Sequence, residues 1–368
     1  MKVVVIGGGV AGLAIGWRLS QAGASVTVLE RDLAGRGATW ASAGMISCAG
    51  ETAGEAGAWT AFARASRSLW PGFAREIEEA SGVDIAYRTG GALLVATDAA
   101  QARDLRTRAE RLAAMGERCR WLGADEAHAE EPMLAAGIAG ALRDDDDAHV
   151  DNRALGDALA AAATKAGAIL REHCAVHSVR VERGKARGVI ADCGAVDGDA
   201  VVLAAGAWSS AIGGGAAQPV RPVKGQMIAL APPAGARRPR RVIWGQGIYL
   251  IPRKDRVRVG ATMEEAGFDT AISKAACEKL HADAAALLPG LSDWSIAECW
   301  AGLRPAAPDG LPLLGPAAIA NLFVASGQFR NGILFAPAVA DALSRLVLGV
   351  SPSLVLDAFD PRRFSPES

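Results

Sequence analysis

The sequence predicts an α/β fold with two domains, one built on a doubly wound parallel sheet and the other on an antiparallel sheet. Residues 3–6 form a β-branched run without polar alternation, which is typical of a strand buried on both faces of a parallel sheet. Residues 201–206 form another buried strand of this kind. Residues 218–262 differ, because three strand-like stretches are separated there by Pro-rich turns, as in an antiparallel meander.

Composition narrows the class of protein. The 368 residues carry 39 Lys+Arg and 40 Asp+Glu, a formal net charge of −1, which disfavours a nucleic-acid-binding protein. Hydrophobic residues make up 51%, enough at this length for one large core or two smaller ones. The 43 glycines and 17 prolines stay below the level of low-complexity sequence, so we expect a globular protein.

Three features of the sequence could suggest a disulfide framework or a metal site, and we interpret each of them as structural. Six cysteines without a Cys-x-x-Cys pair disfavour a disulfide framework or a zinc ribbon. His173 and His177 have a metal-ligand spacing for a helix, but residues 168–182 are predicted to form a strand, which would hold the two rings too far apart. The acidic run 144–147 lacks the glycine and distal glutamate of an EF-hand, so we expect a solvated turn.

The apolar N-terminus superficially resembles a signal peptide. Three glycines at 7–9 interrupt it, and no apolar run in the chain reaches the roughly 18 residues of a membrane-spanning helix. We therefore expect no transmembrane segment and a cytoplasmic location.

The motif Gly7-x-Gly9-x-x-Gly12 lies between the first strand and a helix, and Glu30 ends the next strand. In this context such glycines let the backbone approach a pyrophosphate, and the helix N-terminus stabilises the phosphate charge. Glu30 would accept hydrogen bonds from the ribose diol of an adenosine and repel a 2′-phosphate, which disfavours NADP. The sequence thus predicts a Rossmann-like dinucleotide-binding domain.

The other elements follow in chain order. Residues 31–58 have no apolar periodicity and form either a long loop or the lining of a functional site. We expect two helices near 59–81, helices at 99–115, 152–165, 273–288 and 332–348, and strands at 25–29, 92–97, 168–182, 223–230, 242–251, 256–260 and 322–325. Residues 1–84, 142–217 and 300–368 are assigned to the nucleotide domain, and residues 85–141 and 218–299 to the second domain.

The segment 36–45 points to the kind of dinucleotide. In an NAD enzyme, the second half of the sheet would normally follow the glycine motif directly. Here a segment rich in small residues intervenes, and small residues suit a flat tricyclic ring that lies against the backbone. This segment strongly resembles the flavin-contacting segment of glycine oxidases in the D-amino-acid oxidase superfamily. Residues 201–208 look like the second dinucleotide-lining strand of that family, residues 300–312 like its substrate-arginine motif, and residues 327–334 like its C-terminal flavin motif.

The resemblance implies an FAD-binding Rossmann-like domain with a second, antiparallel-sheet α+β substrate domain, as in D-amino-acid oxidase. The FAD is expected to be non-covalent, because residues 301–303 contain no cysteine to carry it. Gln328 departs from the family motif, where histidine is common. The expected cofactor contacts are Gly7, Gly9, Val10, Ala11, Gly12, Glu30, Arg31, Arg36, Thr39, Ala43, Gly44, Met45, Val176, Ala205, Gly206, Trp208, Arg330, Asn331, Gly332, Ile333 and Leu334.

Four residues are candidates for the substrate side. Arg304 precedes a proline that keeps it extended, and its planar guanidinium can bind a carboxylate through two parallel hydrogen bonds. The resemblance implies that Arg304 anchors the amino-acid carboxylate, that Tyr249 helps hold it, and that Arg330 faces the substrate side of the flavin. Met45 would line the apolar side of the pocket. The alternatives are an ion-paired arginine at 304, a core tyrosine at 249, and packing roles at 330 and 45.

The resemblance implies oxidative deamination of glycine and related small amines such as sarcosine, D-amino acids and N-substituted glycines. A neutral amine assists as the Cα hydrogen leaves as hydride to flavin N5, with no dedicated protein base. The imine hydrolyses to a 2-oxo acid and ammonia or an amine, oxygen becomes hydrogen peroxide, and in thiamine biosynthesis the imine itself is used.

Two other functions stay open at this point. One is a D-amino-acid or D-hydroxyproline dehydrogenase that passes electrons to an acceptor other than oxygen. The other is a nucleotide-binding module without chemistry. The expected partners are a small amino-acid substrate and oxygen, with no nucleic acid, and a homo-oligomer is left open.

Overall fold

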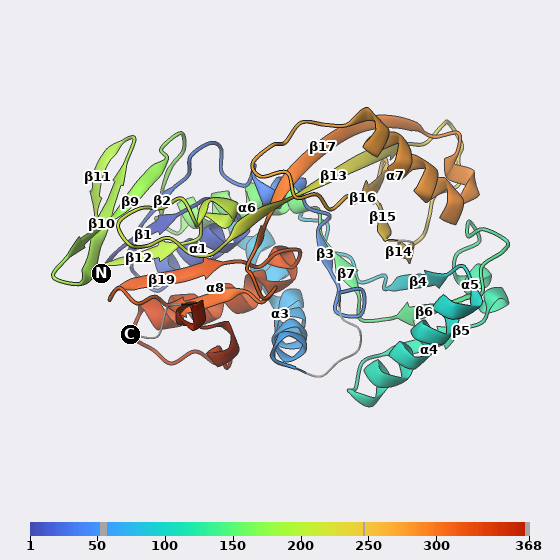
Figure 1. Ribbon diagram of the computed structural model, residues 1–368, viewed down its shortest axis with the longest axis horizontal. Coiled ribbons are helices and arrows are strands. Elements are labelled where there is room, and N and C mark those ends of the chain that lie inside the picture. Colours follow the sequence, from blue (N-terminus) through green and yellow to red (C-terminus); the bar gives the residue numbers. More distant parts are fainter. Residues whose placement is uncertain (52–56, 246, 365–368) are drawn as a thin grey trace.

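The computed structural model describes residues 1–51, 57–245 and 247–364, so part of the expected loop 31–58 lies outside the described residues. One half of the molecule is built on a six-stranded sheet of order β18-β19-β12-β1-β2-β8 (Figure 1). Its strands are β1 (Lys2–Ile6), β2 (Ser25–Leu29), β8 (Ile169–Arg171), β12 (Ala200–Leu203), β18 (Leu313–Pro316) and β19 (Leu322–Ser326). Neighbouring strands are parallel except β18 and β19. The two runs predicted to be buried, β1 and β12, lie side by side at the centre.

Four helices pack on this half: α1 (Val10–Gln21), α3 (Ala58–Ser81), α6 (Asn152–Lys165) and α8 (Gly332–Val347). Their apolar faces and one face of the sheet form the largest hydrophobic core, in which Leu13, Trp70 and Phe335 are fully buried. The prediction of two helices near 59–81 is wrong, because α3 continues through Pro71. Trp70 Nε1 donates to Leu334 O of α8 at 3.0 Å, so packing stabilises one long helix across the proline.

The other half is built on an eight-stranded sheet of order β17-β13-β16-β15-β14-β4-β6-β5 (Figure 1). Its strands are β4 (Ala92–Ala96), β5 (Cys119–Leu122), β6 (Gly140–Asp144), β13 (Arg221–Ala231), β14 (Val242–Gly245), β15 (Ile248–Pro252), β16 (Val257–Gly260) and β17 (Ser295–Ala306). All neighbours are antiparallel except β14 and β4, so the predicted antiparallel strands are present, but only β14, β15 and β16 follow one another as in a meander, because β13 pairs with β16.

Two strand predictions in this half need correction. The single strand expected over residues 242–251 is a pair, in which Ile243 of β14 lies opposite Leu250 of β15. The Gly- and Pro-punctuated stretch after Trp300 belongs to β17, which runs beside β13 from Ser295 to Ala306. Long antiparallel pairing with β13 stabilises this strand although its own residues have little strand propensity.

Three further helices lie on the eight-stranded half: α4 (Ala99–Ala114), α5 (Ala124–Glu130) and α7 (Lys274–Leu287). The predicted helices at 99–115 and 273–288 are therefore confirmed to within one residue at each end. α7 packs on β13, β15 and β16, and this contact forms a second core around Leu250 and Leu287. Figure 1 shows α4 and α5 at the end of the molecule that lies farthest from β9–β11.

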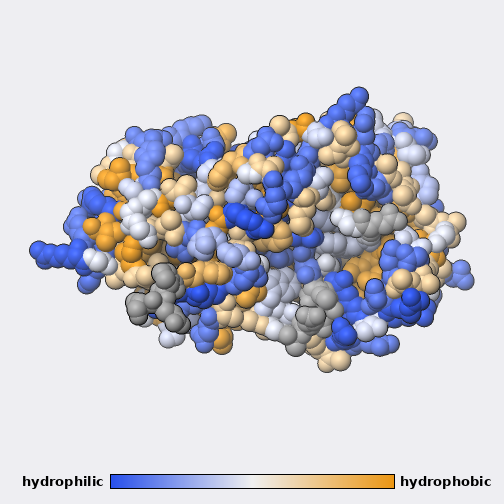
Figure 2. All heavy atoms as spheres, in the orientation of Figure 1, coloured by the Kyte–Doolittle hydropathy of each residue, from blue (hydrophilic) through white to orange (hydrophobic). Residues whose placement is uncertain are grey.

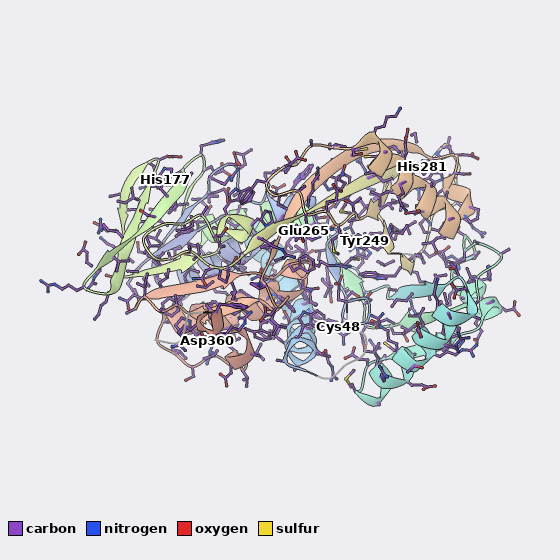
Figure 3. All side chains as sticks on the ribbon, in the orientation of Figure 1. Cys48, His177, Tyr249, Glu265, His281 and Asp360 are labelled. Carbon is purple, nitrogen blue, oxygen red and sulfur yellow. A yellow bond between two sulfur atoms is a disulfide. The ribbon has the colours of Figure 1, made fainter. Side chains whose placement is uncertain are left out.

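The expected single strand 168–182 is interrupted. β8 ends at Arg171, and β9 (Val176–Glu182) forms a small separate sheet with β10 (Lys185–Ala191) and β11 (Gly194–Asp197). The interruption brings Cys174 to the β10–β11 turn, where it forms a disulfide with Cys193. The sequence disfavoured a disulfide framework and gave no signal for this single bridge, because tertiary pairing of β9 with β10 brings the two cysteines together. Figure 3 shows His177 on this small sheet, where its ring contacts Asp192 at 2.6 Å.

The acidic run 144–147 is not the solvated turn that the sequence predicts. Asp144, the last residue of β6, and Asp147 are 0% and 2% exposed. Three arginines pair with the middle of the run: Arg118 with Asp146 at 2.5 Å, Arg67 of α3 with Asp146 at 3.8 Å, and Arg143 of β6 with Asp145 at 2.7 Å. The ion pairs therefore belong to Asp145 and Asp146, whereas burial raises the pKa of Asp144 and Asp147 and the nearby Arg67 opposes both shifts.

The short elements are α2 (Ala38–Ala41), the strand pair β3 (Met45–Ile46) and β7 (Ala148–His149), and four 3₁₀ turns, of which η1 (Gly206–Trp208) follows β12. The others are η2 (Pro289–Leu291), η3 (Asp357–Phe359) and η4 (Pro361–Phe364). Figure 1 places β3 and β7 between the two halves. Figure 2 shows hydrophilic and apolar residues intermixed over this face. Among the described helices, none has the length and apolar character needed to cross a membrane.

Candidate active site

A cavity of about 440 Å³ extends from the carboxyl ends of β1, β2 and β12 to strands β13, β15 and β17. Every predicted site residue lines it except Gly12 and Leu334. Gly12 packs behind the cavity, because a Cβ there would lie 1.9 Å from Gly7 O. Leu334 is buried, and its carbonyl accepts hydrogen bonds from α3. The segments that the sequence singled out separately are therefore brought to one cavity, while the roles of the individual residues stay predictions.

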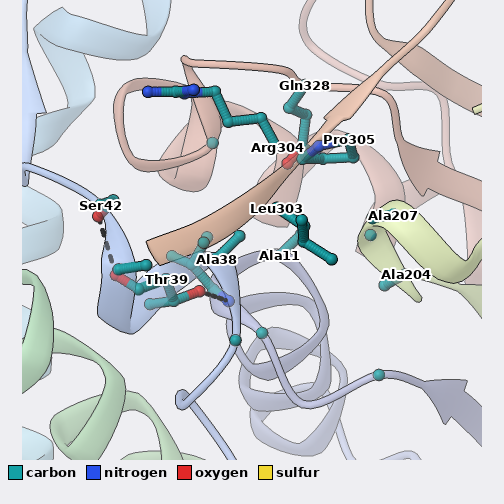
Figure 4. Close-up of a pocket in the computed structure, with 18 of the residues that line it drawn as sticks. Ala11, Ala38, Thr39, Ser42, Ala204, Ala207, Leu303, Arg304, Pro305 and Gln328 are labelled. Atoms are coloured by element: carbon teal, nitrogen blue, oxygen red, sulfur yellow. Dashed lines mark hydrogen bonds between the residues drawn. The ribbon is translucent and has the colours of Figure 1, made fainter. Parts of the chain in front are cut away.

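The glycine motif forms one end of the cavity. Gly7 has a φ of +103°, and a Cβ there would lie 2.4 Å from Ala204 O, so only glycine lets the ends of β1 and β12 approach. Gly9 is the N-cap of α1 and supplies no capping side chain. Val10 N donates instead to Thr39 Oγ1 at 2.9 Å (Figure 4). The first turn of α1 therefore faces the cavity and is held against the segment that carries Thr39.

Glu30 lies at the end of β2, where the fingerprint predicts the ribose-binding acid. Its carboxylate accepts hydrogen bonds from Gly8 N at 2.7 Å and Asp32 N at 3.0 Å, which orient it toward the cavity. Beside it, the Arg31 guanidinium stacks 3.9 Å from the centroid of the Trp208 ring. Val176 lines the same end. Together these residues can enclose an adenosine.

The segment 36–45 forms the middle of the cavity wall and contains the helix α2. Asn152 Nδ2 donates to Thr39 O at 2.9 Å and to Trp40 O at 2.7 Å, which ties α2 to α6. Arg253 Nη2 donates to Ala43 O at 2.9 Å and so fixes the backbone just before Met45. The small side chains of this wall leave a flat face, as the sequence predicts for a tricyclic ring.

Strand β17 crosses directly behind α2. A Cβ on Gly302 would lie 2.3 Å from the Cβ of Ala41, so this position admits only glycine. Trp300 Nε1 donates to Ala41 O at 2.9 Å and fixes the crossing. Because alternate residues of a strand face the same side, Trp300, Gly302 and Arg304 share one face of β17.

Figure 4 shows the extended side chain of Arg304, which comes from β17, the strand that pairs with β13. Its guanidinium lies against Gly225, where a Cβ would be 2.3 Å from Nη1. Nη1 donates to Thr262 O at 3.1 Å and, more weakly, to Lys224 O at 3.3 Å. These contacts place the guanidinium at the cavity wall, beside the Tyr249 hydroxyl.

Tyr249 lies on β15 near the centre of the molecule, as Figure 3 shows, and is 8% exposed. It lies opposite Gly260 in the sheet, and its hydroxyl is 4.0 Å from Met227 Sδ. Burial raises the pKa of the Tyr249 phenol, and the neighbouring charge of Arg304 opposes the shift. The phenol is therefore a neutral hydrogen-bond donor beside a cation.

Several cavity residues were missed by the sequence reading. The largest omission is Glu51, whose Oε1 accepts from Arg330 Nη2 at 3.1 Å. Gly225 and Met227 of β13 also line the cavity. Residues 223–230 were predicted to form a strand of the second domain, and because alternate residues share a face, both residues lie on one face of that strand. The pattern could therefore have indicated them. Glu51 lies within the segment 31–58, whose lack of periodicity indicated a loop or a site lining but did not identify which of its residues reach the cavity.

The residues present fit a bound FAD. Two helix N-termini, those of α1 and α8, open on the cavity, and neither cap residue supplies a capping side chain in the described part of the chain. Such N-termini stabilise anions, here the pyrophosphate and the negative charge on a reduced ring. Gln328 Nε2 is a buried donor without a partner among the described residues, as expected where a ligand supplies the acceptor. The cavity thus combines residues that can enclose an adenosine, two helix N-termini that can stabilise anions, and a wall of mostly small residues from segment 36–45.

The family model described as "DAO: FAD dependent oxidoreductase" matches residues 2–346. Among curated proteins, the chain is 36% identical to the glycine oxidase of Pseudomonas aeruginosa over 99% of this chain and 98% of that one. It is 35% identical to the bifunctional protein ThiO/ThiG of Synechocystis, over 98% of this chain and 54% of that protein. The chain therefore spans about half the length of the first curated relatives it matches.

Solved structures agree with the sequence relatives. The crystal structure of glycine oxidase from Geobacillus kaustophilus has a TM-score of 0.93 at 33% identity and covers 99% of this chain and 100% of that one. That of iminodiacetate oxidase from Chelativorans sp. BNC1 has a TM-score of 0.86 at 28% identity, covering 98% of each chain. The predicted fold class and the resemblance to glycine oxidases are confirmed. Because the family model spans nearly the whole chain, the protein belongs to the DAO family of FAD-dependent oxidoreductases.

Proposed function

We propose that the protein oxidises glycine and related small amines, among them sarcosine, D-amino acids and N-substituted glycines. The products are an imine, which hydrolyses to a 2-oxo acid and ammonia or an amine, and hydrogen peroxide from oxygen. Similarity to glycine oxidases over nearly the full chain supports this reaction class. The relation to ThiO/ThiG supports a supply of the imine to thiamine biosynthesis.

One observation carries the proposal. The Arg304 guanidinium and the flat wall formed by segment 36–45 line the same cavity. A carboxylate bound by Arg304 and by the Tyr249 hydroxyl leaves the rest of a small amino acid to extend along the wall. The guanidinium is fixed by β13 and the carbonyl of Thr262, so this orientation requires little reorganisation.

The protein's own residues act by binding and orientation. FAD, when bound, supplies a two-electron acceptor that takes the Cα hydrogen as hydride. Arg304 and Tyr249 hold the carboxylate, and Met45 closes the apolar side. The N-terminus of α8, with Asn331 as its N-cap, provides N–H groups from Gly332 onward that stabilise negative charge on the reduced ring.

Anaerobic titration tests the proposal. Glycine, sarcosine, D-alanine or D-proline should bleach the flavin absorbance of the purified protein, and air should restore it with hydrogen peroxide formed. Failure of all four to reduce the flavin would contradict the proposal. Turnover with an artificial acceptor but not with oxygen would identify the dehydrogenase instead. The domain boundaries given above, a cytoplasmic location and a homo-oligomer stay predictions.

A further inference from the structure

Glu51 is a buried carboxylate in the cavity that the proposed chemistry leaves unused. It follows β3, and the turn 47–51 is fixed by hydrogen bonds from Gly50 N to Ser47 Oγ at 3.0 Å and from Glu51 N to Cys48 O at 3.2 Å. Trp244 packs so closely on Gly50 that a Cβ there would lie 2.4 Å from its ring. The side chain of Glu51 is 9% exposed. The turn therefore holds this carboxylate at the cavity wall.

Charged and titratable groups from five other elements face Glu51. One of its oxygens accepts from Arg330 Nη2 at 3.1 Å, and the other has no hydrogen-bond partner within the described ranges. Burial raises the pKa of the Glu51 carboxyl, and the arginines oppose the shift. The facing groups are Arg330 before α8, Arg304 on β17, Arg108 on α4, Tyr249 on β15 and Asp147 before β7.

Amines of this class exist in neutral water as ammonium ions, and an ammonium nitrogen has no lone pair to assist loss of hydride from Cα. The proposed reaction therefore requires that one proton leave the nitrogen first. Of the cavity-lining residues within the described chain, the groups able to accept a proton from an ammonium are Glu30, Asp32, Glu51 and His177. Glu30 lies at the adenosine end with both oxygens bonded to backbone N–H groups, Asp32 pairs there with Arg31, and the His177 ring contacts Asp192 on the small sheet, which leaves Glu51. Resting on the proposed function, we propose that Glu51 accepts the proton of the substrate ammonium and is a catalytic residue.

The proton and electrons balance through one turnover. The ammonium N–H bond breaks and the proton moves to a Glu51 oxygen, which leaves a neutral amine. The Cα–H bond then breaks with both electrons, and the nitrogen lone pair forms the C=N bond of an iminium ion. Oxygen takes up the two electrons with the transferred hydrogen and the proton held by Glu51, which yields hydrogen peroxide. Glu51 returns to its ionised form for the next substrate.

The competing role is that Glu51 only positions Arg330. The variant Glu51→Gln separates the two roles, because an amide oxygen still accepts from Arg330 but cannot take a proton. Rates of anaerobic flavin reduction by glycine are measured against pH by stopped flow. We expect the Gln variant to be slower at neutral pH by about 10²-fold or more, and to regain rate tenfold per pH unit until the substrate amine is itself neutral. Identical pH profiles for the variant and the wild type would overturn the proposal.

Two further measurements keep the test decisive. If Glu51→Gln does not bind FAD, the wild-type profile still discriminates. A rate of flavin reduction that becomes constant well below the pKa of the free amine supports a proton acceptor within the protein. A rate that rises tenfold per pH unit up to that pKa excludes such an acceptor. Glu51→Asp should keep the wild-type shape at a lower rate.

A matched control comes from a second buried carboxylate. Glu117 is 5% exposed and pairs with Arg67 at 2.5 Å, but it does not line the cavity. Glu117→Gln should keep the wild-type pH profile, and a profile like that of Glu51→Gln would overturn the assignment. A wild-type flavin that no amine reduces refutes the proposed function itself. Reduction with coincident profiles of wild type and Glu51→Gln refutes only the role of Glu51.

Discussion

Replacement of Arg304 by alanine tests the substrate side of the site most directly. The guanidinium is held by contact with Gly225 and by hydrogen bonds from Nη1 to the carbonyls of Thr262 and Lys224. Nη1 is already used by these carbonyls, so the remaining guanidinium donors, which lie beside the Tyr249 hydroxyl, would bind a substrate carboxylate. The alanine variant removes both this charge and these donors while leaving β17 paired with β13.

The expected loss follows from the environment of the guanidinium. Leaving one member of a buried, hydrogen-bonded charge pair without its partner costs about 2–5 kcal/mol. Arg304 is only half-buried, and Arg330 stays nearby as a second cation, so we expect the lower part of this range. A loss of about 2–3.5 kcal/mol corresponds to a roughly 30- to 300-fold weaker binding of glycine.

The assay is the dissociation constant for glycine from anaerobic flavin reduction, together with that of a simple carboxylate inhibitor such as acetate. Both should weaken in parallel. Gly225→Ala is the matched control for position, because its new methyl group cannot coexist with the guanidinium at 2.3 Å and must displace it without removing its charge. It should weaken glycine by about 10-fold, a value consistent with 1.4 kcal/mol. Unchanged constants for Arg304→Ala would remove this residue from the site.

Three other changes give separate outcomes. Tyr249→Phe removes one hydrogen bond to a charged carboxylate. This change should raise KM for glycine by roughly 10–100-fold, about 1.5–3 kcal/mol, and leave kcat nearly unchanged. A fall confined to kcat in steady-state assays would contradict this expectation. Gly302→Ala places a methyl group 2.3 Å from the Cβ of Ala41. The methyl group should displace α2 and weaken FAD binding, at a cost of about 1–3 kcal/mol. Normal flavin content after dialysis would refute the close contact of β17 with α2. Burial, then the charge of Arg253, lowers the pKa of His149 to about 3, below its usual value. The folded state therefore resists protonation of His149, so the stability present above pH 6.5 is lost as the pH falls toward 3. In His149→Gln the free energy of unfolding should fall less steeply with pH, by up to about 1.4 kcal/mol per pH unit. Equal slopes for the two proteins in urea unfolding would exclude this contribution of His149.

The prediction succeeded where a local pattern carries its own physical reason. The run 3–6, the glycine motif and Glu30 each depend on residues close in the chain, and the structure brings them to one end of the cavity. It failed where burial or pairing is decided by distant elements. Asp147 is buried among residues of other elements, with Ser47 and Arg67 as its favourable partners, and Cys174 meets Cys193 because β9 pairs with β10.

Local sequence determined the dinucleotide-binding half of this protein, since a parallel strand, a glycine turn and a helix N-terminus form from consecutive residues. The resemblance of short motifs also indicated which distant segments belong to the flavin site. Only the tertiary structure decided the substrate end. There the partners of Arg304 come from β13 and from the residues after β16, and Glu51 comes from a turn without periodicity. Such contacts depend on strand register and on close approach of backbones, which residues adjacent in the chain do not specify.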